Sequence, residues 1–214
     1  MARTRSPEHD AQKSLRVDAA AEMFACSSYA STSMADLAAA TGTSKARLYH
    51  YYKSKDAILS DLLDRYTRRL LSLATEVECA HSGTRNDGRA RIADLVASFL
   101  EEYGASRFRH VAMINDAKYL SHDQQDILRE RQRTIVHVFS DALLRAYPKR
   151  VSIENKSIIT MMLFGAMNWT FMWLKPDGKV SYSLFAEHVL DVFEGGLAGT
   201  GARRSRTSAM RFQM

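Results

Sequence analysis

Four side chains close together in the sequence could pair with phosphates and base edges: Lys45, Arg47, Tyr49 and His50. They offer two positive charges, a phenol and an imidazole, and arginine commonly donates to the O6 and N7 atoms of guanine. Leu48 and Tyr52 lie four residues apart, so in a helix they pack inward on one side. The segment therefore predicts a helix with a basic, aromatic outer face, in which Lys45, Arg47 and His50 are candidates to contact bases.

Two short helices and a tight turn are predicted to position this face. Residues 34–41 carry apolar side chains at helical spacing, Thr41-Gly42-Thr43 turns the chain, and residues 45–52 form the second helix. Ser33 begins a Ser-x-x-Asp capping box, and Ser44 takes the N-cap of the second helix. Hydroxyl and N–H groups at such helix starts can hold phosphates. Two crossed helices joined by a glycine-containing turn are the helix-turn-helix design.

Nearly all of the chain has helical patterning. No sustained alternation of apolar and polar residues occurs, so strands are not expected. The predicted helices span residues 11–27, 34–41, 45–52, 56–80, 89–105, 107–119, 122–147, 152–174 and 182–196. The expected fold class is all-α, with an N-terminal three-helix helix-turn-helix domain and a larger C-terminal helical bundle. The expected boundaries are 11–70 for the first domain, 71–200 for a ligand-binding and dimerisation domain, and 201–214 for a basic, disordered tail.

Composition and motifs argue against several other classes of protein. The 214 residues carry a formal net charge of +6 and two cysteines, too few for a disulfide framework. Gly-rich phosphate loops and the common catalytic motifs are absent, so we predict no catalytic residue, no metal, no cofactor and no enzyme activity. Residues 158–174 are uncharged but short for a membrane span and include Asn168, which favours a buried helix. No apolar run follows the basic N-terminus, so no membrane partner and a cytoplasmic location are expected.

Two helices in the second half favour association with a second copy. Residues 152–174 are apolar on nearly all sides, so that helix needs partners on two sides. Residues 182–196 are preceded and followed by polar segments and carry one apolar stripe, formed by Ala186, Val189, Leu190, Phe193 and Leu197. One side of each helix can pack in its own core, and a second subunit can cover the other. We therefore expect a homodimer that presents two recognition helices to two half-sites.

The residues around the motif resemble the N-terminal domain of the TetR family of bacterial repressors. The matching residues are Ala20-Ala-Glu-Met-Phe24, Tyr29, Thr32-Ser-Met-x-Asp-Leu-Ala38, Thr41-Gly-Thr-Ser44, Leu48-Tyr49 and Tyr52-Lys-Ser-Lys55-Asp-Ala-Ile-Leu59. The resemblance covers about residues 12–63 and implies double-stranded operator DNA as a partner, with contacts from Tyr49 and Tyr51 to the DNA backbone. Lys55, at the start of the fourth helix, is expected to bind phosphate. The DNA-binding residues expected are thus Ser33, Thr43, Ser44, Lys45, Arg47, Tyr49, His50, Tyr51 and Lys55.

One position departs from the pattern of that family. Family members commonly have glycine just before the aromatic residue between the first two helices, where this chain has Ser28. Glycine suits a left-handed backbone at a helix end. We expect Ser28 to make the same turn at a cost of about 1 kcal/mol.

The second domain is rich in methionine and aromatic residues, which line ligand cavities as well as ordinary cores. The family resemblance implies a cavity for a small effector, and Asn168-Trp169 with the following Trp173-Leu-Lys175-Pro176 resembles a subgroup responsive to fatty acids and acyl-CoA. The expected effector residues are Arg107, Met113, Tyr119, Arg133, Phe139, Met162, Met167 and Trp169. The expected function is a repressor that a small apolar effector, such as a fatty acyl-CoA, releases from DNA. The alternatives are a regulator of drug efflux or stress genes that responds to diverse hydrophobic compounds, and a constitutive DNA-binding protein without an effector.

Overall fold

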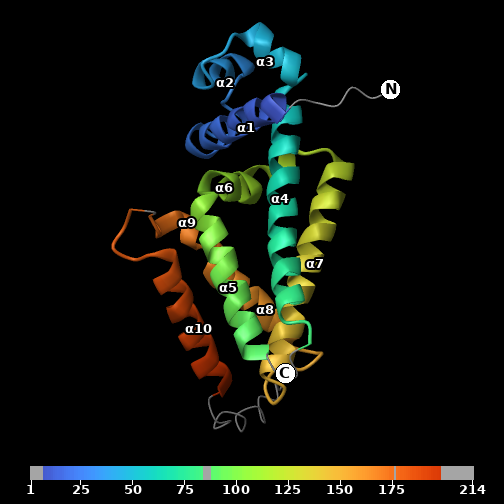
Figure 1. The fold of residues 1–214 in the computed structure, drawn as a ribbon, viewed down its shortest axis with the longest axis vertical. Helices are drawn as coiled ribbons and strands as arrows, with labels where there is room; N and C mark the ends of the chain where they lie inside the picture. Colours follow the sequence, from blue (N-terminus) through green and yellow to red (C-terminus); the bar gives the residue numbers. More distant parts are fainter. Residues whose placement is uncertain (1–6, 84–87, 176, 199–214) are drawn as a thin grey trace, which may run out of the picture.

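The computed structural model describes residues 7–83, 88–175 and 177–198, and all regular structure in these ranges is helical. The molecule is elongated, with three helices at one end and a bundle below them (Figure 1). The helices are α1 (Pro7–Ser27), α2 (Met34–Ala40), α3 (Lys45–Tyr51), α4 (Lys55–Ala80), α5 (Gly88–Ala105), α6 (Arg107–Asp116), the 3₁₀ helix η1 (Ala117–Tyr119), α7 (His122–Ala146), α8 (Lys156–Asn168), α9 (Thr170–Trp173) and α10 (Tyr182–Ala198). The all-α prediction is confirmed. The predicted tail 201–214 lies outside the described residues.

Helices α1 to α3 form a small unit whose buried side chains are continuous with the core of the bundle. The side chains of Phe24, Leu37 and Leu48, one from each helix, are buried together. The predicted capping box is present, because the Ser33 hydroxyl accepts from the Asp36 N–H and the Asp36 carboxylate accepts from the Ser33 N–H. Ser28 has φ +68°, so the left-handed turn expected of this residue is confirmed.

Helix α4 connects this unit to the rest of the molecule. It runs unbroken from Lys55 to Ala80, begins beside α3, and packs against α1, α5, α6 and α7. Residue 70, where the first domain was expected to end, lies within α4. The three-helix unit and the bundle therefore share one continuous helix (Figure 1).

The prediction of one continuous helix over residues 152–174 is wrong, because the helix starts later and is interrupted. The Asn155 side chain accepts from the Ser152 N–H and donates to the Arg150 carbonyl, and this turn delays the start of α8 to Lys156. The helix then breaks at Trp169, giving α8 and the short α9. Within the described ranges, no helix is both long and apolar enough to cross a membrane.

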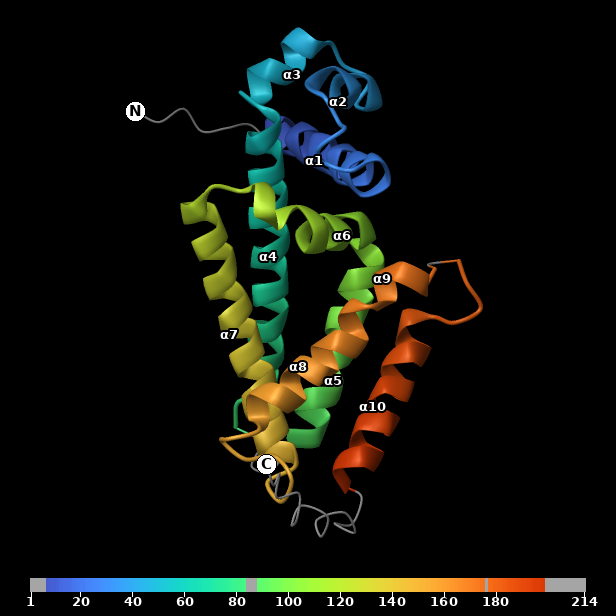
Figure 2. The ribbon, with the colours of Figure 1, turned by 180° about the vertical axis from the view of Figure 1, so that it is seen from behind.

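Helices α8 and α10 lie side by side on one face of the bundle (Figure 2). Part of the predicted α10 stripe, Ala186 and Val189, is buried, and α10 packs on α5. Several large apolar side chains on and between α8, α9 and α10 remain exposed. They are Ile158, Met161, Met162, Trp169, Met172, Trp173, Leu184 and Val192.

Candidate nucleic-acid interface and ligand cavity

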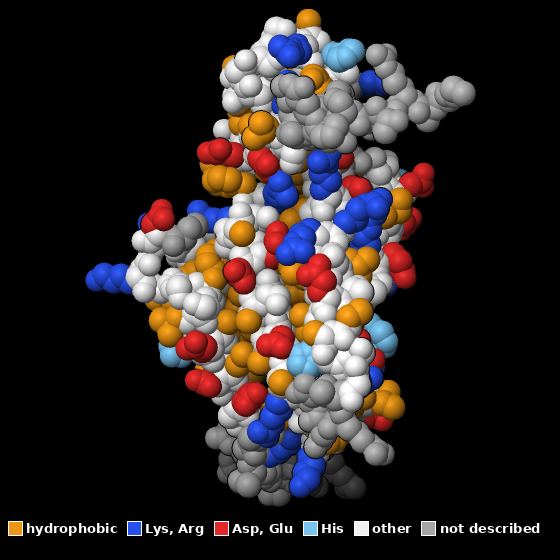
Figure 3. Space-filling model, in the orientation of Figure 1, with side chains coloured by type: hydrophobic (Ala, Val, Ile, Leu, Met, Phe, Trp, Pro, Cys, Tyr) orange, Lys and Arg blue, Asp and Glu red, His pale blue; other side chains and the backbone are white. Residues whose placement is uncertain are grey.

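The outer side of α3 carries the predicted basic and aromatic side chains. Lys45, Arg47, Tyr49 and His50 are all exposed, whereas Leu48 and Tyr52 are buried beneath them. Figure 3 shows basic and histidine side chains at the tip of the molecule, where α3 lies. The sequence therefore predicted correctly which side of the helix faces outward, and DNA contact by these residues stays a prediction.

The other predicted DNA-binding residues surround this face. The Ser44 hydroxyl caps α3 by accepting from the Arg47 N–H at 3.2 Å, and Thr43 is half-buried in the turn. Tyr51 is half-buried because the Arg16 guanidinium of α1 lies 4.0 Å from its ring centre. Ser33 caps α2 at the edge of the unit. Apart from Lys55 and Ser33, which lies at the start of α2, the predicted set thus lies in the α2–α3 turn and on α3.

Lys55 has a different placement from the one expected of a phosphate-binding residue. Its ammonium group donates to the carbonyl oxygens of Tyr29 and Thr32 at 2.7 and 2.9 Å, and it lies 4.2 Å from the centre of the Tyr29 ring. Tyr119 of η1 stacks on that same ring, with centroids 4.7 Å apart. Lys55 therefore fastens the α1–α2 loop to α4, and the partners it uses are backbone groups that sequence spacing does not reveal.

This geometry predicts that Lys55→Met lowers the free energy of unfolding by about 1–2 kcal/mol, because two charge-assisted hydrogen bonds to carbonyl groups are lost. Lys45→Met, on the exposed side of α3, is the matched control and is expected to leave stability unchanged. Urea unfolding of both variants measures the difference. Unchanged stability of Lys55→Met together with weaker binding to every DNA sequence would instead support the phosphate role.

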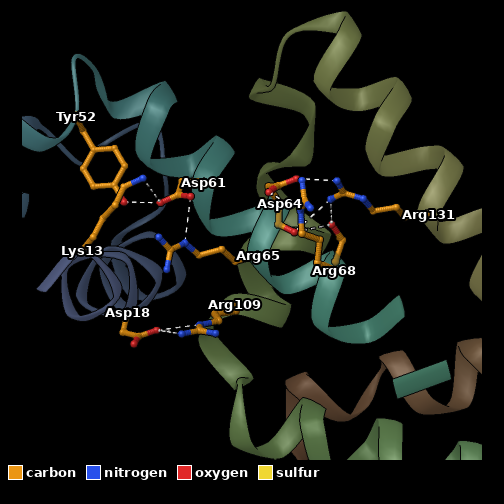
Figure 4. Close-up of polar contacts among 10 residues, drawn as sticks. Lys13, Asp18, Tyr52, Asp61, Asp64, Arg65, Arg68, Arg109 and Arg131 are labelled. Carbon is orange, nitrogen blue, oxygen red and sulfur yellow. Dashed lines mark hydrogen bonds and ion pairs between the residues drawn. The ribbon is translucent and has the colours of Figure 1, made fainter. Parts of the chain in front are cut away.

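A set of ion pairs attaches the three-helix unit to the bundle (Figure 4). The Asp61 carboxylate of α4 forms ion pairs with the Lys13 ammonium of α1 and the Arg65 Nε, both at 3.1 Å. It also accepts a hydrogen bond from the Tyr52 hydroxyl at 2.5 Å. Burial alone would raise the pKa of Asp61, but these hydrogen bonds outweigh it and hold the pKa below its usual value. Asp18 of α1 pairs with Arg109, whose Nε lies 2.8 Å away on α6. The unit is thus tied to both α4 and α6.

A second polar contact joins α4 to α7. The Arg131 guanidinium donates to the Asp64 carboxylate at 2.7 Å and to the Thr67 hydroxyl at 2.9 Å (Figure 4). Arg68 donates to the other oxygen of Asp64 at 2.9 Å. Although burial raises it, the pKa of Asp64 is lowered overall by the hydrogen bonds from Arg131 and Arg68. Arg131 thereby fixes the spacing between α4 and α7 next to the cavity described below.

A cavity of about 210 Å³ lies between α4, α5, α7 and α8. Most of its lining is apolar, and none of the lining side chains is charged. The lining residues are Thr67, Leu70, Phe99, Tyr103, Met113, Gln132, Ile135, Val136, Met161, Phe164 and Asn168. Leu70, Phe99 and Tyr103 are buried, whereas Gln132 and Met161 are exposed, so the cavity opens between α7 and α8.

A smaller recess of about 120 Å³ adjoins the cavity along α4, and the two share Thr67. Asp64 and Arg131 are both in its lining, so its positive charge is already paired. The other lining residues are Ser60, Leu63, Leu120, Gln124, Ile127 and Leu128. Both the cavity and the recess are therefore lined mostly by apolar surface.

Of the eight predicted effector residues, Met113 is the one that lines the cavity. Phe139 and Met167 are fully buried, and Phe139 packs against the Phe99 and Phe164 rings that do line it. The remaining five lie elsewhere. Tyr119 stacks on Tyr29, Met162 and Trp169 are exposed on the α8–α10 side, Arg107 donates to the Phe171 carbonyl at 3.3 Å, and Arg133 is exposed beside Glu130.

These five residues therefore lie outside this cavity, and the physical reason is helix rotation. In a helix that is apolar on most sides, composition does not tell which residues face inward, and Met161 lines the cavity while Met162 faces away. Thr67, Gln132 and Ile135 also line the cavity but were not among the residues predicted from the sequence. The one lining residue with a distinctive sequence signal is Asn168, a polar residue inside an uncharged segment.

His110 of α6 lies in a buried aromatic cluster above the cavity. Its Nδ1 is 2.9 Å from the Tyr66 hydroxyl of α4, and its ring stacks on Tyr103 of α5 at 3.8 Å between centroids. The residue is 1% exposed, and burial lowers the pKa of His110 to about 4. The imidazole is therefore neutral at physiological pH and joins three helices where the unit meets the bundle.

Comparisons with known proteins agree with this arrangement. Residues 17–62 match the family model for bacterial regulatory proteins of the tetR family, and residues 85–197 match that for the tetracyclin repressor-like C-terminal domain. The HTH-type transcriptional repressor KstR2 of Rhodococcus jostii is 25% identical over 186 residues, which is 85% of this chain and 89% of that protein.

Solved structures give the same result. A TetR-family regulator from Bordetella parapertussis is 37% identical with a TM-score of 0.78, and the match covers 85% of this chain and 93% of that one. AibR, solved with isovaleryl coenzyme A and operator DNA, is 17% identical with a TM-score of 0.73, over 85% of this chain and 97% of that one. The latter likeness shows the fold alone.

Proposed function

Because the chain belongs to the TetR family of bacterial regulatory proteins, which are DNA-binding regulators and not enzymes, we propose that it is a homodimeric repressor released from its operator by a small effector in the cavity. The observation that carries this proposal is the position of the cavity against α4. Thr67 and Leu70 line it, and the same helix begins at Lys55, beside α3. Occupancy of the cavity and the position of α3 are thus linked by one helix.

Two contacts carry a displacement from the cavity to the three-helix unit. Met113 lines the cavity on α6, and Arg109 of α6 holds Asp18 of α1. A ligand that moves α4 or α6 therefore changes the spacing of the two recognition helices in a dimer, while DNA half-sites keep a fixed spacing. The ligand must prefer the spacing that does not fit DNA, since equal affinity for both states shifts nothing. A coupling of about 1–3 kcal/mol weakens operator binding roughly 5- to 150-fold.

The dimensions of the cavity favour a short apolar group. An apolar cavity of about 150 Å³ holds benzene, so the 210 Å³ here suits a group of one ring or a short branched chain. A fatty chain of sixteen carbons or so does not fit. A thioester of coenzyme A would place its acyl group inside and its nucleotide outside, through the opening at Gln132 and Met161. We propose short acyl-CoA thioesters as the first effectors to test, the class found in the AibR complex.

The test uses a duplex selected from a random library by the wild-type protein. Its complex is titrated with acyl-CoAs of increasing chain length and with the corresponding free acids, and DNA release is followed by fluorescence anisotropy. Short acyl-CoAs are expected to release the duplex from the wild type. In Val136→Trp, which fills the cavity, operator affinity is expected to be insensitive to the same compounds. Release that is identical in both proteins, or no release from the wild type, contradicts the proposal.

The homodimer rests on the exposed apolar side chains on and between α8, α9 and α10. Exposed apolar side chains are stabilised when they are buried against the same side chains of a second copy. A two-fold axis brings the same patch of both subunits together. The Val192 residue of α10 is 75% exposed.

We expect Val192→Arg to convert the protein to a monomer, because an isologous contact places the introduced charge of each subunit in the same interface. Leu15→Arg, at an equally exposed leucine on α1, is the matched control and is expected to remain dimeric. Light scattering measures both masses. A wild-type mass of 24.1 kDa at micromolar concentration would contradict the dimer itself.

A further inference from the structure

A buried arginine lies on the inner side of α1. Arg16 is 8% exposed, and it precedes by one turn the buried Ala20 on the side of the helix that faces the core. An apolar side chain is usual at such a position, because removing a charge from water is unfavourable unless other groups compensate it. Arg16 therefore places a positive charge inside the three-helix unit, where core packing does not require one.

The aromatic ring of Tyr51, at the end of α3, lies against this charge. The Arg16 guanidinium carbon is 4.0 Å from the centre of that ring, a distance at which the ring attracts a cation. The His50 ring meets the Tyr51 ring at an angle of 87°, with the two ring centres 5.8 Å apart. Tyr51 is half-buried, whereas His50 is exposed on the outer side of α3. Arg16, Tyr51 and His50 thus form a row of contacts from the inside of the unit to its outer face.

The neighbouring contact between α1 and the end of α3 is of a different kind. Lys13, one turn before Arg16, lies 5.0 Å from the centre of the Tyr52 ring. Tyr52 is buried, and its hydroxyl donates to Asp61 of α4 at 2.5 Å, so this contact stays within the junction with the bundle. Of the two contacts, the one to Tyr51 is the one that continues to the exposed side of α3.

We propose that Arg16 is a positioning residue for DNA binding, which acts through Tyr51 and does not touch DNA itself. This proposal rests on the proposed function, in which α3 binds operator DNA with Tyr51 at the backbone and His50 at the bases. A ring that already rests on a cation has less rotamer freedom to lose when its hydroxyl meets a phosphate. The same ring restricts the rotamers of His50 beside it. Arg16 thereby raises operator affinity by holding the end of the recognition helix in its binding geometry.

The experiment is a double-mutant cycle between Arg16 and Tyr51, measured as affinity for the selected duplex. Arg16→Gln is expected to weaken binding about fivefold to tenfold when Tyr51 is present, and less than about twofold in the Tyr51→Leu background. Fluorescence anisotropy gives the four affinities, at a temperature at which circular dichroism shows each protein to be folded. Arg16→Lys keeps a cation within reach of the ring and is expected to bind within about threefold of the wild type.

The matched control is Lys13→Gln, which removes an equal charge from the same side of α1. Because Lys13 contacts the buried Tyr52 and pairs with Asp61, this variant is expected to lower the free energy of unfolding in urea. Its affinity for the selected duplex is expected to stay within about twofold of that of the wild type, since the contact does not reach the outer side of α3.

An equal loss of affinity on Arg16→Gln in both backgrounds overturns the proposal, because the loss would then reflect charge alone. Lower stability with unchanged affinity also overturns it, since Arg16 would then serve the fold only. Arg16→Met, which fills the inward position with an apolar chain, replaces Arg16→Gln in the cycle if the latter does not fold. Failure of the wild type to select any duplex would overturn the DNA contact and this proposal together. A selected duplex that Arg16→Gln binds normally would remove the role of Arg16 alone.

Discussion

Replacing Lys45 and Arg47 together by alanine is expected to weaken binding to the selected duplex about 100-fold. Both side chains are exposed on α3 and belong to its outward face. A bidentate arginine contact to a base contributes about 1–3 kcal/mol of discrimination, and a lysine at a phosphate adds affinity that falls with salt. The loss is expected to include sequence preference, so that the variant binds selected and random duplexes almost equally.

The control variant also removes two positive charges, but from a different helix. Arg129 and Arg133 are exposed on α7, far along the chain from α3, and each pairs with an acid on its own helix. Their double alanine variant is expected to bind the selected duplex within about twofold of the wild type, apart from a small change in long-range attraction. Titrations at two salt concentrations separate the two effects. Equal losses in both double variants would mean that net charge, and not the face of α3, determines binding.

The second large effect is a loss of stability at acidic pH caused by His110. Its pKa is about 4 in the folded protein, whereas an unfolded histidine has a pKa of about 6.5. Between these values the unfolded state binds a proton that the folded state does not, so stability falls as pH falls. The loss begins near pH 6.5, is about 2 kcal/mol at pH 5 and about 3 kcal/mol at pH 4, and levels off below about pH 3.

His110→Gln isolates this contribution because glutamine keeps a hydrogen-bonding group near Tyr66 and does not titrate. The variant is expected to be less stable than the wild type at pH 7, and the difference is expected to shrink by about 2 kcal/mol on going to pH 5. His137→Gln, at an exposed histidine of α7, is the matched control for the loss of a histidine outside the buried cluster. Urea unfolding at a fixed protein concentration measures all three proteins. A constant difference between His110→Gln and the wild type would show that His110 titrates normally in the folded state.

Local features of this fold could be predicted because they depend on neighbours in the sequence. The capping box at Ser33, the N-cap at Ser44 and the left-handed turn at Ser28 each involve residues within a few positions. The inward side of α3 followed from Leu48 and Tyr52 alone. These features placed the predicted DNA-binding face of α3 correctly on the outside.

The contacts that define the cavity and the junction could not be predicted in the same way. The partners of Lys55 are backbone carbonyls more than twenty positions away, and the Arg131–Asp64 pair joins residues 67 positions apart. The lining of the cavity depends on how each apolar helix is rotated, which sequence periodicity leaves open for α8. This is why, among the residues predicted to bind an effector, Met113 lines the cavity while Met162 and Trp169 are exposed outside it.

One state of the protein is expected to bind DNA and another to hold the effector. The reciprocal effect of DNA on effector binding tests this expectation most directly. The acyl-CoA that releases the operator most effectively is titrated by calorimetry into the free protein and into the protein saturated with operator duplex. Thermodynamic linkage requires the effector to bind the DNA complex more weakly by the same factor by which it weakens operator binding, about 5- to 150-fold. Equal effector affinity in the presence and absence of DNA would contradict the account, because cavity and recognition helix would then be uncoupled.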